Sequence, residues 1–183
     1  MKVSIILPVY NGEETLDDCL EAISKIDYPK NDFELIVVND GSKDHTDEII
    51  ESFINRKNSE INIKYFNLKK NVGRIKARLK GVKESSYNNL LFIDHRGMVN
   101  RDIIHKIEER EYQPIIGNSY QDKKASIISN FFYVLRRIFY YPFWGEDFED
   151  VYISKDNFDR IAKGFCPFFC ERDLLLRNIP KSK

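Results

Sequence analysis

Residues 3–9 read VSIILPV, a nearly unbroken run of aliphatic and β-branched side chains close to the start of the chain. A strand that is apolar on both faces is typical of a parallel sheet whose two sides are covered by helices. Residues 13–26 follow with apolar side chains at every third or fourth position, which is helical spacing, and residues 33–38 form a second strand-like run. This order predicts that residues 3–9 are a central strand of an α/β sheet.

The same alternation continues to about residue 107, with short turns such as Asn39–Ser42 between the elements. The later elements are expected to be a helix carrying Ile49, Ile50, Phe53 and Ile54, a strand at 61–66, a basic helix at 74–84, a strand at 90–93, a helix carrying Ile103, Ile104 and Ile107, and a short strand at 115–116. Strands that alternate with helices over short connections predict a doubly wound, mostly parallel, Rossmann-like sheet flanked by helices. A chain of 183 residues is the size of one ordinary domain, so we expect a single core.

The charge of the chain is balanced, with 29 basic and 29 acidic side chains. No long-range field therefore attracts nucleic acid, and an anionic ligand must be held by local groups. The chain has three cysteines, no signal-peptide pattern and no apolar stretch of the roughly 18 residues that a membrane span needs, which predicts a cytoplasmic protein with reduced thiols. Cys166 and Cys170 could form half of a zinc site, but no second Cys or His pair follows, which disfavours zinc.

Polar clusters follow three of the expected strands, namely Pro8–Asn11, Asn39–Ser42 and Asp94–Arg96. In an open α/β sheet, ligands bind beyond the carboxyl ends of the strands, so we expect these clusters to meet at one edge. Tyr10 offers a ring that can stack on a nucleobase, and Asp40 offers a carboxylate that can accept a hydrogen bond from a base or a ribose. Asp94 places a second carboxylate where a sugar-phosphate could lie.

Four segments, in order, resemble the motifs of family 2 glycosyltransferases: SIILPVYNGEETLDDCL at 4–20, ELIVVNDGSKDHT at 34–46, NVGRIKARLKGV at 71–82 and LLFIDHR at 90–96. Each segment alone is a weak signal, but their order and spacing together are specific. The resemblance implies a GT-A fold, with residues 1–183 as a single domain. Its nucleotide-binding half would be residues 1–112 and its acceptor-side half residues 113–183.

The resemblance implies that the protein moves a sugar from a nucleoside-diphosphate sugar, of the uridine or guanosine type, to a hydroxyl of a glycan or a lipid-linked acceptor. The matching positions and implied roles are Pro8, Tyr10 and Glu13 in the nucleoside pocket, Asp40 at the base, Asp94 at the ribose or the metal-bound diphosphate, and Arg78 at the diphosphate. Structural explanations stay open beside these roles. A packed strand end would account for Pro8 and Tyr10, and an acidic first helical turn for Glu13. A turn before Gly41 would account for Asp40.

The sequence departs from the family pattern at Arg96. The family usually has a second carboxylate there, which helps to bind Mn²⁺ or Mg²⁺, so Asp94 is the one candidate metal ligand left in the triplet. An arginine repels a cation and cannot bind it. Two interpretations stay open: Arg96 itself neutralises the diphosphate as a catalytic group, or the site has lost its metal and its turnover.

A second departure concerns the catalytic base, which in inverting members of the family is an acidic side chain that deprotonates the acceptor hydroxyl. Asp147, in Gly145-Glu146-Asp147, has the expected lettering. Residues 164–176, however, resemble the segment that normally precedes this base. Either Asp147 is the base, or the base lies beyond Lys183 and the chain is truncated or degenerate; we favour the second interpretation.

Residues 126–144 concentrate aromatic side chains around Arg136 and Arg137. This stretch could contact the inner face of a membrane near a lipid-linked acceptor, although aromatic packing in the core is the favoured explanation.

Two other functions are weighed against a transferase. One is a catalytically impaired GT-A-like module that only binds nucleotides. The other is a nucleotidyltransferase, which is disfavoured because no glycine-rich phosphate loop follows residues 3–9.

Overall fold

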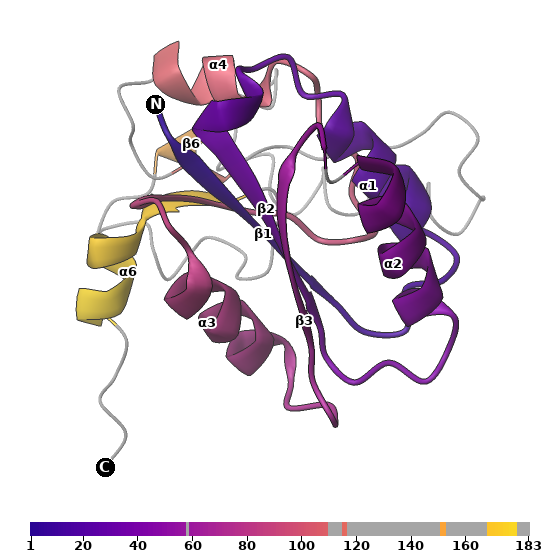
Figure 1. The fold of residues 1–183 in the computed structure, drawn as a ribbon. Helices are drawn as coiled ribbons and strands as arrows, with labels where there is room; N and C mark the ends of the chain where they lie inside the picture. Colours follow the sequence, from indigo (N-terminus) through magenta and orange to yellow (C-terminus); the bar gives the residue numbers. More distant parts are fainter. Residues whose placement is uncertain (58, 110–114, 117–150, 153–167, 179–183) are drawn as a thin grey trace, which may run out of the picture.

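The computed structural model describes residues 1–57, 59–109, 115–116, 151–152 and 168–178, which form a mixed sheet between two layers of helices (Figure 1). The strands lie in the order β3-β2-β1-β4-β7-β5-β6. Their bounds are β1 Val3–Val9, β2 Phe33–Asn39, β3 Asn62–Asn67, β4 Asn89–Phe92, β5 Ile115–Ile116, β6 Val151–Tyr152 and β7 Phe168–Glu171. β1 to β4 are parallel to one another, whereas β7 pairs antiparallel with β4 and β5, and β5 pairs antiparallel with β6. The predicted doubly wound, mostly parallel α/β fold is confirmed.

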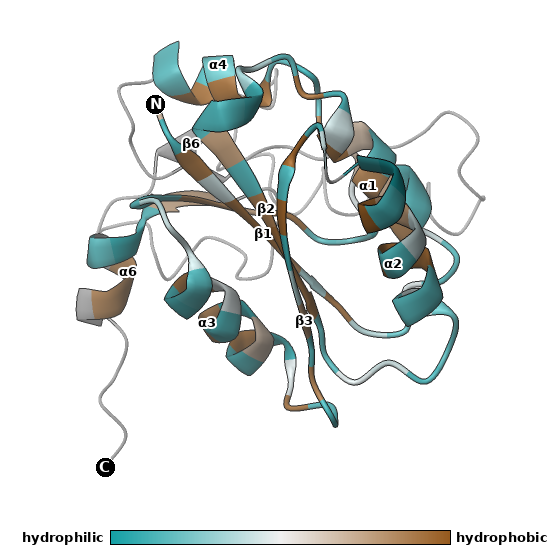
Figure 2. Cartoon of the chain, viewed as in Figure 1, coloured by the Kyte–Doolittle hydropathy of each residue, from teal (hydrophilic) through white to brown (hydrophobic). Residues whose placement is uncertain are grey.

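Helices cover both faces of the sheet. Their bounds are α1 Leu16–Ser24, α2 Thr46–Lys57, α3 Arg74–Glu84, α4 Ile103–Glu109 and α6 Arg172–Asn178, with a short 3₁₀ turn, η1, at Lys30–Asp32. Alternate side chains of β1 explain why both faces are apolar: Val3, Ile5 and Leu7 belong to the core that α1, α2 and α4 cover. Ile6 belongs to the core under α3 and α6. Figure 2 shows the result, with apolar strands at the centre and hydrophilic outer helix faces.

One expected helix is shorter in the structure, and one strand was not predicted. The helix expected at 13–26 begins only at Leu16, because the carbonyl of Gly12 accepts hydrogen bonds from the N–H groups of Thr15 and Leu16 in a turn. β7, which pairs with β4 and buries Phe169 and Cys170 in the sheet, was not predicted as a strand of this sheet. Asp147, the stretch 126–144 and Cys166 lie outside the described residues.

The amino-terminal end of the sheet is held by a buried carboxylate. Glu34 has no exposed surface and accepts hydrogen bonds from the Ser4 hydroxyl at 2.6 Å and from the backbone and hydroxyl of Ser86 at 2.6 and 3.0 Å. Lys64 Nζ lies 2.9 Å from the same carboxylate. Burial alone would raise the pKa of Glu34, but these hydrogen bonds lower it below its usual value. This cluster ties β1, β2 and β3 to the start of β4, away from the carboxyl ends of the strands.

Among the residues that the structure describes, no helix has the length and apolar character needed to cross a bilayer.

Candidate functional site

The loops after β1 and β2 are joined by hydrogen bonds from backbone N–H groups to side chains. The N–H of Asn11 donates to the Ser42 hydroxyl at 2.9 Å, and the Asn11 side chain in turn accepts from the N–H of Lys43 at 2.9 Å. The N–H of Gly12 donates to the Thr46 hydroxyl at 2.8 Å. Asn11 has a φ of 49°, which asparagine tolerates better than most residues. The two loops therefore form one connected rim at the carboxyl edge of the sheet.

Glu13 belongs to this rim, but the structure gives its carboxylate a role in holding the loops together. Its Oε2 accepts a hydrogen bond from the N–H of His45 at 3.1 Å, and its own N–H donates to Asp44 at 3.1 Å. Burial would raise the pKa of Asp44, but hydrogen bonds from the Thr46 hydroxyl and from the N–H groups of Glu13 and Thr46 lower it overall. Glu13 does not line the cleft described below.

Asp40 holds a third loop, the one between β3 and α3. Its side chain is almost fully buried, with 2% of its surface exposed. Oδ1 accepts from the N–H of Val72 at 2.7 Å, and Oδ2 accepts from the N–H of Gly73 at 3.0 Å. The N–H of Asp40 itself donates to the carbonyl of Val9 at 2.8 Å. One carboxylate thus fixes the position of the start of α3 relative to β1.

Gly41 allows the loop between β3 and α3 to pass close to the loop after β2. Its φ is +68°, and a Cβ added there would lie 2.5 Å from the carbonyl carbon of Lys70 and 2.7 Å from the nitrogen of Asn71. Real Cβ atoms do not approach backbone atoms so closely, and the left-handed region disfavours side chains. A glycine is therefore required after Asp40.

A network of polar side chains connects the loop after β2 to the end of β3 and to α2. The Asn39 side chain accepts from the N–H of Ser42 at 3.0 Å and donates to the Tyr65 hydroxyl at 3.3 Å. The Tyr65 hydroxyl donates to Asp47, whose other oxygen accepts from the Asn67 amide at 2.8 Å. Burial, and then the hydrogen bond to Asp47, raise the pKa of Tyr65 well above its usual range. The network fixes the chain direction as it leaves β3.

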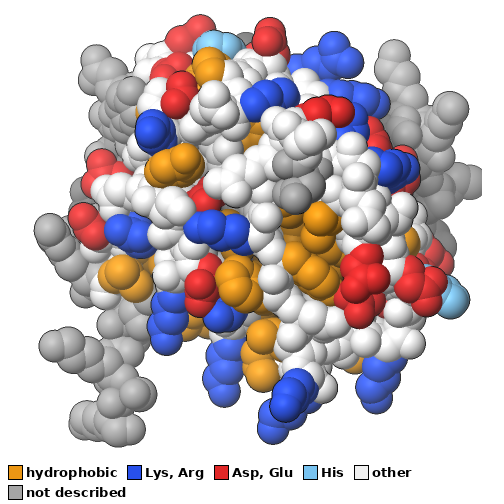
Figure 3. Space-filling view, viewed as in Figure 1, with side chains coloured by type: hydrophobic (Ala, Val, Ile, Leu, Met, Phe, Trp, Pro, Cys, Tyr) orange, Lys and Arg blue, Asp and Glu red, His pale blue; other side chains and the backbone are white. Residues whose placement is uncertain are grey.

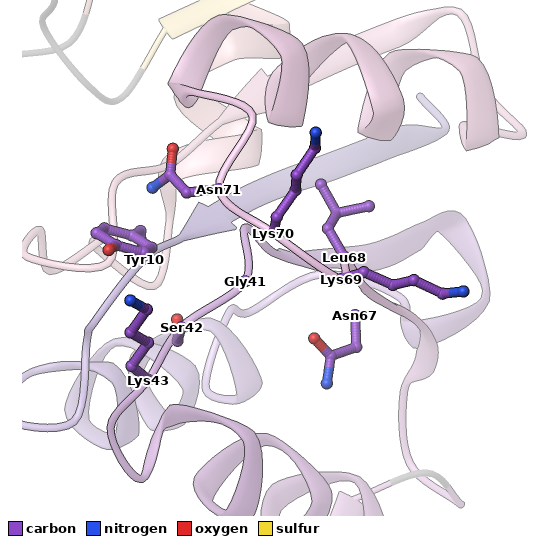
Figure 4. A pocket seen from close by; sticks show the side chains of 9 residues that line it. All are labelled: Tyr10, Gly41, Ser42, Lys43, Asn67, Leu68, Lys69, Lys70 and Asn71. Carbon is purple, nitrogen blue, oxygen red and sulfur yellow. The ribbon is translucent and has the colours of Figure 1, made fainter.

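Together these loops enclose an open cleft of about 660 Å³. The residues that line it are Tyr10, Gly41, Ser42, Lys43, Asn67, Leu68, Lys69, Lys70 and Asn71 (Figure 4). All the charged lining residues are lysines, and the Tyr10 ring, 40% exposed, lies beside the side chains of Lys43 and Asn71. Basic side chains also project from the lower edge of the molecule in Figure 3, where the loop after β3 lies in Figure 1. The cleft therefore suits a planar group joined to an anion.

The turn after β4 lies on the other side of β1, since β4 and β2 flank that strand. The carbonyl of Asp94 accepts from the N–H of Gly97 at 2.8 Å, and its Oδ1 accepts from the N–H of Arg96 at 3.2 Å. His95 points inward: 8% of its surface is exposed, and its Nδ1 lies 3.0 Å from the Thr15 hydroxyl. Burial lowers the pKa of His95, and the charge of Arg96 lowers it further against the opposing effect of Asp94. Asp94 is half-buried and Arg96 is exposed, so solvent reaches both residues.

Two of the other predicted residues lie outside the cleft. Pro8 is buried within β1, opposite Val38 of β2, which is the packed strand position weighed as its alternative. The Arg78 guanidinium lies 6.0 Å from the centre of the Phe92 ring, close to the end of β4. Of the predicted residues, Tyr10 lines the cleft, whereas Asp40 lies behind its wall, bonded to Val72 and Gly73. Asp94 lies beyond β1.

Residues 67–71, which form one wall of the cleft, were not among the predicted site residues. The same rule that singled out the other strand ends would have found them, because this segment directly follows the strand expected at 61–66. Within the described parts of the chain, no three His, Cys, Asp or Glu side chains come together as a metal-binding group.

A family model described as "Glycosyl transferase family 2" matches residues 4–114. The poly-beta-1,6-N-acetyl-D-glucosamine synthase of Staphylococcus epidermidis is 33% identical over 131 residues, which cover 69% of this chain and 30% of that protein. The poly(ribitol-phosphate) beta-N-acetylglucosaminyltransferase TarS of Staphylococcus aureus is 34% identical over 105 residues, 57% of this chain and 18% of TarS. The chain thus spans less than a third of the length of these curated relatives.

Solved structures show the same fold. S. aureus TarS 1–349 in complex with UDP-GlcNAc aligns with a TM-score of 0.60 and 29% identity, over 69% of this chain and 37% of that one. The mannosyltransferase PcManGT from Pyrobaculum calidifontis, in complex with GDP-Man and Mn²⁺, aligns with a TM-score of 0.54 over 56% of this chain and 30% of that one. Its identity is only 20%, so this second likeness concerns the fold alone.

Proposed function

The chain belongs to glycosyl transferase family 2, and on that premise we propose that it binds a nucleoside-diphosphate sugar at its strand-end loops and transfers the sugar to a hydroxyl group. The single observation that carries the proposal is the cleft beside Tyr10, whose charged lining residues are all lysines. An exposed ring next to ammonium groups suits a nucleobase joined to a diphosphate.

A uridine nucleotide is the donor type that we propose first. TarS has been solved with UDP and with UDP-GlcNAc, and both relatives above carry N-acetylglucosamine in their names. In this chain the base would stack on Tyr10. Asp40 would hold the wall of the cleft through Val72 and Gly73, and the lone pairs left on its carboxylate could accept a hydrogen bond from an imide N–H of the base.

Asp94 and Arg96 are proposed to act at the sugar-phosphate end of the donor. Both are accessible to solvent in the turn after β4, which adjoins β1 on the side away from the cleft. A donor that begins at Tyr10 would then cross the end of β1, as ligands do in open α/β sheets. The acceptor would be a glycan or a lipid-linked hydroxyl, and an acidic side chain would take its proton, Asp147 being the candidate within this chain.

The alternative of a nucleotide-binding module without turnover gains no support from the relatives, which are named as a synthase and a transferase.

The test is release of nucleoside diphosphate from UDP-GlcNAc and, separately, from GDP-mannose, followed by chromatography in the presence of hydroxyl acceptors. We expect UDP release by the 183-residue chain, and a loss of about a hundredfold in Asp94→Asn, because this carboxylate would touch the donor. Asp102→Asn is the matched control, since Asp102 is exposed and paired with Lys106 at 3.0 Å. Absence of release from both donors, with no binding of UDP or GDP, would refute the proposed function.

A further inference from the structure

Arg96 stands in the turn after β4, where family 2 members are expected to carry a metal-binding carboxylate. The turn is closed by two hydrogen bonds to Asp94, from the N–H of Gly97 to the carbonyl and from the N–H of Arg96 to Oδ1. This geometry fixes the backbone of Arg96 while its side chain stays exposed. A cationic side chain is therefore held at the carboxyl edge of the sheet, where the sugar donor is proposed to bind.

The side chains of this turn do not fit a divalent cation. Asp94 is the one carboxylate of the triplet, and its Oδ1 already accepts a backbone hydrogen bond. His95 is turned inward, with Nδ1 against the Thr15 hydroxyl. Arg96 has no lone pair to offer and carries a permanent positive charge, which repels Mg²⁺ or Mn²⁺ at close range. These side chains therefore do not form a site for a divalent metal ion at this turn.

We propose that Arg96 supplies the positive charge for the donor diphosphate, so that nucleotide binding by this chain does not depend on a divalent metal. The inference rests on the proposed function above and concerns the same site. A guanidinium is suited to the task because its planar, forked donors match phosphate oxygens and its hydration is weak.

The same charge would serve the transfer step. The acceptor oxygen forms a bond to the anomeric carbon while the bond from that carbon to the diphosphate oxygen breaks. The electron pair of the broken bond leaves with the nucleoside diphosphate, and the proton of the acceptor hydroxyl passes to a carboxylate base. Negative charge therefore develops on the diphosphate, and a cation fixed beside it stabilises the transition state more than the ground state.

The test is calorimetric titration of the 183-residue chain with UDP, in EDTA and in MnCl₂. We expect the wild-type affinity to agree within about threefold between the two conditions, and Arg96→Gln to lose about tenfold or more in EDTA, as for a lost hydrogen bond between charged groups. Arg96→Asp restores a carboxylate, so its affinity should be low in EDTA and recover with Mn²⁺. Arg101→Gln removes an exposed arginine five positions away and should behave as wild type.

The outcomes separate this inference from the function on which it rests. Wild-type binding that is more than tenfold stronger with Mn²⁺, or an Arg96→Gln variant with unchanged affinity in EDTA, would overturn the role of Arg96 and leave the nucleotide site standing. Absence of UDP and GDP binding in both conditions would overturn the proposed function itself. Circular dichroism of each variant checks that the fold is retained.

Discussion

Replacing Gly41 with alanine places a methyl group where the loop between β3 and α3 passes closest to the loop after β2. The new Cβ would lie 2.5 Å from the carbonyl carbon of Lys70 and 2.7 Å from the nitrogen of Asn71. Both atoms are backbone, so the collision cannot be relieved by a side-chain rotation. The loop after β3 must therefore move away from Asp40.

The expected cost has two parts. A φ of +68° disfavours alanine by about 1–2 kcal/mol. Displacing the loop weakens at least one of the two hydrogen bonds from Val72 and Gly73 to the buried Asp40 carboxylate, each worth about 1.5–3 kcal/mol because the acceptor is charged. The sum is about 2.5–5 kcal/mol, which corresponds to a fall of roughly 5–20 °C in Tm for a chain of this size.

Urea and thermal unfolding of wild type and Gly41→Ala measure this cost. Gly97→Ala is the matched control, because Gly97 is a loop glycine whose added Cβ would meet only the Asp94 carbonyl oxygen, at 3.3 Å, and whose φ is not in the left-handed region. We expect the control to lose less than about 1 kcal/mol. If the two variants unfold with the same free energy, the close approach of the loops does not hold the site together and the reasoning is wrong.

Three further predictions concern single side chains. Tyr10→Ala should weaken UDP binding by about 1–3 kcal/mol in calorimetry through loss of stacking, whereas Tyr10→Phe should stay within about threefold of wild type; equal losses would exclude stacking. Glu34→Gln should lower the free energy of unfolding by about 2 kcal/mol near pH 7. Because the folded-state pKa of Glu34 lies below its usual value of 4.5, that difference should be present above about pH 4.5 and shrink as the pH falls further, which urea unfolding at several pH values would show. Lys70→Gln should lower UDP affinity about threefold at low salt and by less at high salt, since an exposed charge is screened; a salt-independent loss would contradict a simple charge effect.

The first half of the fold could be predicted because its signals are local. β1, β2 and α3 were each recognised from a run or a periodicity within a single segment, and their bounds agree with the structure to within one residue. The antiparallel β7 was not predicted, because its neighbour in the sheet, β4, lies far away in the chain and no hairpin turn joins them. Family membership, inferred from the ordered motifs, is confirmed by the match over residues 4–114.

The sequence allowed candidate site residues to be named, but it did not predict which groups those residues contact. The rule that ligands bind at strand ends singled out Tyr10, Asp40 and Asp94, and all three follow the carboxyl ends of strands in the structure. It could not show that Glu13 and Asp40 accept hydrogen bonds from backbone N–H groups of other loops, since such partners depend on how distant segments meet. Glu34, likewise, sits in an apolar strand pattern with no local sign that Lys64 would pair with it. The functional roles of all the predicted site residues, Arg78 and Asp147 included, stay predictions.

The central claim is that the loops after β1, β2, β3 and β4 form one nucleotide-sugar site, and amide chemical-shift mapping tests it most directly. A ¹⁵N-labelled chain titrated with UDP should show its largest shift changes at residues 10–13, 41–43, 67–73 and 94–97. Shift changes confined to one of these loops would show that the loops do not form one site. Changes concentrated elsewhere, or none at saturating UDP, would contradict the proposed nucleotide-sugar site.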